Sequence, residues 1–235
     1  LVDRLRAGEA FDGAAMLPTR YLLSGRAESG PEDPWPNFQL DGYGTWLFAL
    51  HSHLGGTDPL AYRAAVELAA EYLAAAWELP CYDYWEEFGD RRHTSTLAAV
   101  AAGLRAASRM LDRPDLDETA DAVVRFIQTS CVSGGLIVKG PKDDRLDASL
   151  ISLVTPFGLI SAQDPTLRAT IKGIRISLAS PSGGIRRYLG DSYYGGNPWL
   201  LLTSWLGWHG RLNDNATGPS RPRYWVRAPP AHQGW

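Results

Sequence analysis

The stretch "LAAVAAGLRAASRML" at residues 97–111 decides the fold class of this chain. Its apolar residues recur three and four positions apart: Leu97, Val100, Ala101, Leu104 and Leu111. Because an α-helix turns once every 3.6 residues, this spacing puts them on one face. The stretch is therefore predicted to be an amphipathic helix with one buried side.

A second helix is predicted after the short connection 112–115. The same spacing recurs over 116–131, in Leu116, Ala120, Val123, Val124, Ile127 and Cys131. Further helical patterns cover 41–54, 59–77, 145–155, 166–179 and 198–210. "GGLIVKG" at 134–140 is too short to build a sheet, and no continuous strand pattern competes. The expected fold class is all-α.

Three helix-start signals agree with these ranges. Asp58-Pro59 and Asp164-Pro165 each place a capping aspartate before a proline, which suits the first helical position. Asp115 and Glu118 have the spacing of a capping box.

The connections between these helices alternate in length. Those at 24–40, 78–93, 132–145 and 180–197 are long and rich in Gly, Pro, Tyr and Trp, whereas 112–115 is short. Alternation of this kind between antiparallel helices predicts a toroid of helical hairpins with its long loops gathered at one end. Loops on a rigid scaffold are where binding residues usually lie. The tail 213–235 has no periodicity.

Composition narrows the function classes. With 235 residues, 45% of them hydrophobic, the chain can bury one sizeable core, so 1–235 is expected to be a single domain. A net charge of -3 offers no basic stripe for nucleic acid, and no apolar run is long enough to span a membrane. Cys81 and Cys131 are expected to be free thiols, and no cofactor or metal site is indicated. No signal-peptide pattern is present, so a cytoplasmic location is expected.

Three of the long loops collect the same kinds of side chain. They read "PWPNFQLDGYGTW" at 34–46, "YDYWEEFGD" at 82–90 and "GGIRRYLGDSYYGGNPW" at 183–199. Together they bring carboxylates, guanidinium groups and aromatic rings. Rings can cover the faces of a sugar, and charged groups can bind its neighbouring hydroxyls in pairs. A solvated charged loop remains the alternative for Glu86 and Glu87.

These motifs, in this order, resemble those of glycoside hydrolase family 15, which contains glucoamylases and glucodextranases. The resemblance runs from about residue 15 to 210. It implies an (α/α)6 barrel, here a partial one without its first and last helices. It also implies an inverting, exo-acting α-glucosidase that releases glucose from the ends of glucans or oligosaccharides.

The resemblance also assigns roles to individual residues. Glu86, the first glutamate after Trp85, is implied to be the general acid. A second set is implied to bind or surround the substrate: Trp35, Asp41, Asp83, Glu87, Arg187, Asp191, Tyr193 and Trp199. Glycosidic cleavage needs one protonated carboxylic acid, and burial against rings with a like charge nearby raises a carboxyl pKa in the required direction.

Two departures from the family pattern stand out. The chain has no Arg-Asp dipeptide before Trp35 of the kind that holds the terminal sugar, and its last glutamate is Glu118. The family's base is a later glutamate, whereas Asp214 is the only carboxyl side chain after Trp199. The chain is therefore expected to be an incomplete catalytic domain that lacks its base and is inactive when isolated.

Other readings stay open at this stage. A trehalase of the same family, a non-catalytic carbohydrate-binding relic and an unrelated helical-toroid enzyme such as a terpene cyclase are the alternatives. The last would need an Asp-rich metal motif, for which "KDDRLD" at 142–147 is a poor candidate. The motifs leave the cleaved linkage undecided.

Overall fold

The described part of the chain is mostly helical, as the periodicity predicts. A computed structural model describes residues 1–11, 13–28, 38–181 and 183–217, with side chains of the last helix up to Arg211. The α-helices are α1 (Val2–Arg6), α2 (Asp41–Leu54), α3 (Arg63–Ala76), α4 (Thr94–Leu111), α5 (Pro114–Ser130), α6 (Pro165–Ser177) and α7 (Leu200–Thr217). Short 3-10 helices are η1 (Gly13–Ala15), η2 (Leu60–Tyr62), η3 (Ala148–Leu153) and η4 (Tyr193–Gly195).

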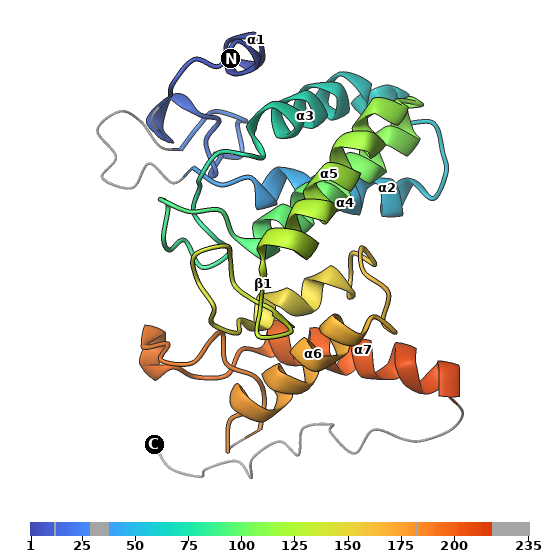
Figure 1. Cartoon of the computed structure of the whole chain (residues 1–235). Coiled ribbons are helices and arrows are strands. Elements are labelled where there is room, and N and C mark those ends of the chain that lie inside the picture. The colour runs from blue at the N-terminus through green and yellow to red at the C-terminus, as the bar shows by residue number, and fades with distance from the viewer. Residues whose placement is uncertain (12, 29–37, 182, 218–235) are drawn as a thin grey trace, which may run out of the picture.

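Strand structure in the described residues is confined to one small hairpin. β1 (Val132–Ser133) pairs antiparallel with β2 (Leu136–Ile137), and Val132 lies opposite Ile137. The hairpin lies at the end of α5, between the upper and lower groups of helices in Figure 1.

Helix α4 is the centre of the core. It packs against α2, α3, α5 and η3, so nearly every residue along it is buried. The sequence pattern predicts only one buried face, and this part of the prediction is wrong. Neighbours surround α4, and the alanines between its larger side chains let them approach.

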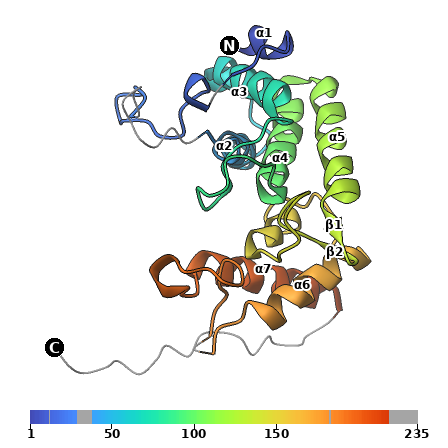
Figure 2. The ribbon, with the colours of Figure 1, turned by 60° about the vertical axis from the view of Figure 1, so that its left-hand side comes forward.

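The remaining helices form a second group beside the first. α6 packs against β2, and α7 packs against η3, which also contacts α4 (Figures 1 and 2). The η3 segment therefore joins the two groups. The helical arrangement agrees with the expected fold class, while closure into a barrel, complete or partial, stays a prediction.

Local signals were right at one helix start and wrong at two. Asp164 caps α6 through its side chain, which accepts a hydrogen bond from Leu167 N at 2.8 Å, and Pro165 occupies the first turn. Asp58 caps nothing, because the chain first makes the 3-10 turn η2. Asp115 also fails to cap α5, since its carboxylate binds Arg113 at 2.6 Å instead. The helix predicted at 145–155 is the shorter 3-10 helix η3.

Other expectations can be compared with the described residues. Cys81 and Cys131 are buried free thiols, as predicted. Over the described ranges, no cluster of histidine, cysteine, aspartate or glutamate is arranged to hold a metal ion. None of the helices in the same ranges is both long and apolar enough to cross a bilayer.

The close crossing of α2 and α4 depends on two glycines. A Cβ added at Gly44 would lie 2.2 Å from the carbonyl oxygen of Ala99, and one at Gly103 would lie 2.6 Å from the Cα of Gly44. Each contact is with backbone, which cannot move aside without separating the helices.

Gly103→Ala is therefore expected to lower the free energy of unfolding by about 1–3 kcal/mol, since overpacking forces the backbones apart. Urea denaturation followed by circular dichroism would measure the change. Gly42→Ala is the matched control, because a Cβ at Gly42 in α2 meets nothing within 4 Å. Equal stability of the two variants would contradict the proposed role of the crossing.

Candidate active site

The loop before α4 folds around the carboxylate of Asp83. Asp83 Oδ1 accepts hydrogen bonds from the backbone N–H groups of Trp85 and Glu87, both at 2.9 Å. Backbone bonds close the same turn, from Glu86 N to Asp83 O at 2.9 Å and from Asp83 N to Glu87 O at 3.1 Å. Glu86 lies between the two held amides with φ at 62°, a left-handed conformation that non-glycine residues rarely adopt. Asp83 is thus the residue that holds Glu86 in place.

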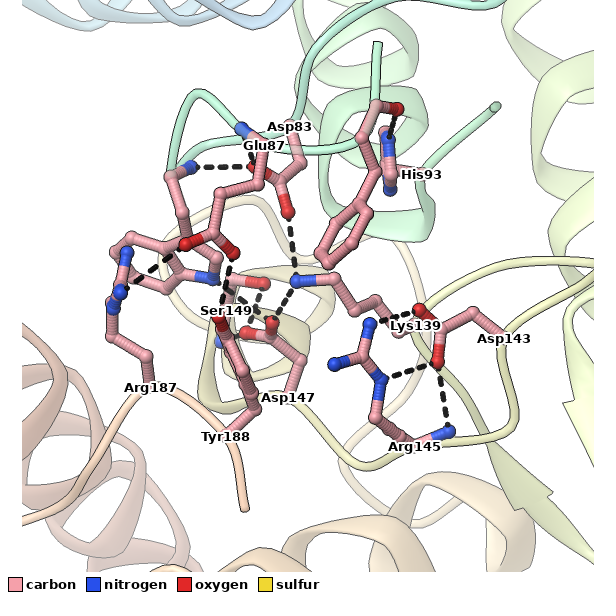
Figure 3. Close-up of polar contacts among 12 residues, drawn as sticks. Asp83, Glu87, His93, Lys139, Asp143, Arg145, Asp147, Ser149, Arg187 and Tyr188 are labelled. Atoms are coloured by element: carbon pink, nitrogen blue, oxygen red, sulfur yellow. Dashed lines mark hydrogen bonds and ion pairs between the residues drawn. The ribbon is translucent and has the colours of Figure 1, made fainter. Parts of the chain in front are cut away.

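A lysine lies on the other side of the Asp83 carboxylate. Lys139 Nζ lies 2.7 Å from Asp83 Oδ2 and donates a hydrogen bond to Asp147 Oδ2 at 2.7 Å (Figure 3). The lysine side chain is 3% exposed, and those of Asp83 and Asp147 are 2% and 1% exposed. Burial lowers the pKa of Lys139, but Asp147 and Asp83 raise it more, so the net pKa lies above its ordinary value. The side chain therefore stays an ammonium ion.

A second set of polar contacts joins the same loop to the segment that follows α6. Arg187 donates from Nε to Asp191 Oδ2 at 2.8 Å and from Nη2 to Glu87 Oε1 at 3.3 Å. Tyr188 OH donates to the other oxygen, Glu87 Oε2, at 2.7 Å (Figure 3). Asp191 also caps the next turn by accepting from Tyr193 N at 2.9 Å. Glu87 is thereby fixed from two sides, although its side chain remains 28% exposed.

Aromatic rings surround this charged group. The ring centroids of Trp85 and Trp199 are 5.5 Å apart, and those of Tyr193 and Trp199 are 6.2 Å apart. The Arg187 guanidinium carbon lies 4.9 Å from the centre of the Tyr193 ring. Tyr193 is 51% exposed, so one of its faces is available to a ligand. The arrangement offers flat apolar faces beside paired polar groups.

Glu86 differs from Asp83 and Glu87 in its exposure to solvent. The residue is exposed, whereas the carboxylates of Glu87 and Asp83 are held by hydrogen bonds and ion pairs. Loss of hydration raises the pKa of Glu86, the charge of Arg20 lowers it, and the charge of Asp83 raises it, with a net rise. A carboxyl group with this direction of shift holds its proton to a higher pH than a solvated glutamate.

Asp41 adds another carboxyl group near the same place, at the first turn of α2. Its Oδ1 is buried with no hydrogen-bond partner among the described residues. Burial raises the pKa of Asp41 to about 7. The backbone N–H groups of residues 41 and 42 oppose the rise, and the charges of Asp83 and Glu86 add to it. The carboxyl group is therefore neutral over much of the acidic range.

Direct contacts connect most of the predicted site residues. Asp83, Glu87, Arg187, Asp191, Tyr193 and Trp199 form one set through hydrogen bonds, ion pairs and ring contacts. Asp41 and Glu86 join it through the electrostatic effects described above. The long connections that carry them lie on the left in Figure 1. Trp35 lies outside the described residues.

Sequence reasoning missed Lys139 and gave Asp147 only a turn position. Lys139 ends the apolar run of "GGLIVKG", and a lone cation there was the only available signal. Asp147 does begin a helix, because its Oδ1 accepts from Ser149 N at 2.8 Å at the start of η3, but its other oxygen serves the lysine. Only the fold brings either residue to Asp83.

The mostly helical fold, with charged and aromatic groups gathered in its long connections, defines the class of protein with which the chain is compared. The family model described as glycosyl hydrolases family 15 matches residues 19–215, so the chain belongs to that family. A relative, isomaltose glucohydrolase from Kribbella flavida, is 36% identical over 233 residues, which cover 96% of this chain and 59% of the relative. The chain thus spans about three-fifths of that protein's length.

Two further comparisons agree with this membership. A solved structure described as a wild-type glycosidase is 35% identical and superposes with a TM-score of 0.83, covering 92% of this chain and 60% of the other. Trehalase 1 from Sulfolobus acidocaldarius is 24% identical over 146 residues, which cover 60% of this chain and 25% of the trehalase.

The raised pKa of Asp41 predicts a pH-dependent effect of its substitution. Because the folded pKa lies above the unfolded one, the protonated carboxyl favours folding at low pH, and this contribution is lost as pH rises from about 4 through about 7. Asp41→Asn should therefore gain stability relative to the wild type between pH 4 and pH 8, by roughly 2–4 kcal/mol.

Chemical denaturation at the two pH values would measure this gain. The exposed Asp58 provides a control, since Asp58→Asn should change stability equally at both. A gain for Asp41→Asn that does not vary with pH would mean that the Asp41 carboxyl group ionises without cost.

Proposed function

We propose that the protein is an inverting, exo-acting α-glucoside hydrolase in which Glu86 is the general acid. The observation that carries the proposal is the contrast between two adjacent glutamates. Glu87 is fixed by Arg187 and Tyr188, while Glu86 is held at a strained backbone position with its carboxyl group exposed and its pKa raised. One carboxylate is thus arranged to bind and the other to exchange a proton.

The acid step follows from these properties. A general acid must keep its proton until the glycosidic oxygen takes it, so a raised pKa favours the reaction near neutral pH. In this proposal, Glu86 donates its proton to that oxygen as the bond to the sugar carbon breaks.

The substrate is proposed to sit between the ion pairs and the rings. Arg187 and Glu87 supply a donor and an acceptor that can bind neighbouring sugar hydroxyls. Tyr193 and Trp199 supply faces against which the ring can pack. The role that family resemblance gives to Trp35, covering the sugar beside the acid, stays a prediction.

The catalytic base is proposed to lie elsewhere than in these carboxylates. An inverting enzyme needs a second carboxylate on the opposite side of the sugar, roughly 6.5–9.5 Å from the acid, to activate water. Asp83 is paired with Lys139, and Glu87 is paired with Arg187, so neither is available for that task. Asp191 is likewise bound to Arg187.

Short α-glucosides are the proposed substrates, with isomaltose first. The relative named isomaltose glucohydrolase matches nearly the whole chain at 36% identity, whereas the trehalase matches 60% of it at 24%. This difference ranks isomaltose above trehalose. Maltose and short maltooligosaccharides test the alternative linkage.

The first test is an assay of glucose release. Residues 1–235 alone are expected to release no glucose from isomaltose, maltose or trehalose, because Asp83, Glu87 and Asp191 are each paired with a cation and Asp41 is buried with a pKa of about 7. A version extended by the coding sequence on either side should release glucose, from isomaltose fastest. Inactivity of both versions would favour a non-catalytic sugar-binding protein, and activity of residues 1–235 would place the base among them.

The second test separates the two glutamates in the form that is active. Glu86→Gln should lower kcat by about 10²–10⁴-fold with a small change in KM, because a glutamine cannot donate the proton. Glu87→Gln should raise KM more than it lowers kcat, since it loses a charged partner of Arg187 and of the sugar. Near-native kcat in Glu86→Gln would show that another residue is the acid.

A further inference from the structure

The buried ammonium of Lys139 lies where three parts of the chain meet. Its backbone carbonyl accepts a hydrogen bond from Thr94 N at 2.9 Å, at the start of α4, and its own N–H donates to Arg145 O at 2.9 Å. These bonds fix the position of the residue before its side chain is considered. The side chain then reaches the loop before α4 and the start of η3.

The two oxygens of Asp83 divide their contacts. Oδ1 holds the backbone N–H groups on either side of Glu86, and Oδ2 faces the lysine. The ammonium therefore fixes the orientation of the carboxylate that fixes the acid turn. Lys139 is thus the ion-pair partner of Asp83.

Asp147 connects Lys139 to the indole ring of Trp85, the residue before the proposed acid. Its Oδ2 accepts from Lys139 and also from the indole Nε1 of Trp85 at 2.9 Å (Figure 3). Lys139 thus holds Asp83 directly. It holds Trp85 and Glu87 indirectly, through the carboxylates that bind them. Glu86 is the residue in this turn that such contacts leave exposed.

We propose that Lys139 is a positioning residue for the acid turn, an inference that rests on the proposed role of Glu86. It acts through Asp83 and Asp147. Its ammonium is paired with two carboxylates that are themselves buried, Asp83 and Asp147, so in this proposal it acts on the turn and not on the sugar. Its task is to keep Glu86 in the left-handed conformation from which the carboxyl group faces outward.

Electrostatics explain why the lysine is needed. Without its charge, two buried carboxylates would face each other, and one would take up a proton or move away. Either change weakens the hydrogen bonds that Asp83 Oδ1 accepts from the backbone N–H groups of Trp85 and Glu87. The strained backbone of Glu86 would then relax, since left-handed conformations of non-glycine residues persist only where their surroundings hold them.

Amide hydrogen exchange on residues 1–235 tests this without any enzyme assay. Lys139→Met should speed exchange of the Trp85 and Glu87 amides by roughly tenfold or more, while the amides of α4 keep their protection. Lys142→Met, at an exposed lysine in the same connection, should leave all of them unchanged. Unchanged exchange at both amides in Lys139→Met would overturn the proposal.

If Lys139→Met fails to fold, Lys139→Gln is the second variant to measure, because it is neutral but keeps a hydrogen-bond donor. Lys139→Gln can still donate to one carboxylate, and it should show the same local increase in exchange to a smaller extent. Loss of α4 protection in both variants would mean that Lys139 serves global folding rather than the acid turn, which also overturns the proposal.

Steady-state kinetics of the active form are the second arm of the test, beside amide hydrogen exchange. Lys139→Met should lower kcat by about 10- to 100-fold and leave KM within about threefold, because it misplaces the acid while Arg187 and Tyr188 still hold the carboxylate of Glu87. In a Glu86→Gln background, the same substitution should lower kcat little further. Additive effects would point to a purely structural role.

The two arms separate the two hypotheses. If no form of the protein is active but the amides at 85 and 87 lose protection, the control of the turn by Lys139 stands and the proposed function fails. If the protein is active and Lys139→Met matches the wild type in both arms, the proposed function stands and the positioning role fails.

Discussion

The contact on which the site depends is the buried ion pair between Lys139 and the carboxylates of Asp83 and Asp147. Removing three charges from water is expensive, and the cost is offset only where geometry is good and the remaining oxygens are hydrogen-bonded. Here Asp83 Oδ1 binds two backbone amides, and Asp147 Oδ1 binds the amide and hydroxyl of Ser149. The ion pair can therefore be buried, and it joins the loop before α4 to the start of η3.

A second group of ion pairs in the same site includes one partly exposed member. Arg187 is shared between Asp191, which is buried with it, and Glu87, which is partly exposed. The contact with Glu87 is the longer one, at 3.3 Å. In the proposed function, a sugar hydroxyl replaces this longer contact at a lower cost than any contact of the Lys139 cluster. One network provides rigidity, and the other provides groups that a ligand can engage.

The helical core explains how loops so distant in sequence can share these contacts. α4 is enclosed by α2, α3, α5 and η3, so its first residues are fixed relative to both groups of helices. Thr94, at that end, binds the backbone of Val138 and Lys139. The loop before α4 and the strand connection after α5 are thereby brought to the same point.

The sequence by itself determined most of the helices and the kinds of residue that the candidate site contains. Spacing of apolar residues located α2, α4, α5 and α6 to within a few residues, because a helix face is a local property. The motifs with Glu86, Glu87 and Arg187 also marked the loops that carry the charged and aromatic groups. Local signals failed where a competing partner was available, as when Asp115 bound Arg113 instead of capping α5.

Only the tertiary structure decided which charges pair and which glutamate stays exposed. Lys139 and Asp83 are 56 positions apart in the numbering, and nothing near either residue in sequence indicates the other. Burial of α4 on all sides, likewise, comes from the neighbours that fold around it. Long-range electrostatic pairing depends on distances in space and on exclusion of water, and both are set only when the helices pack.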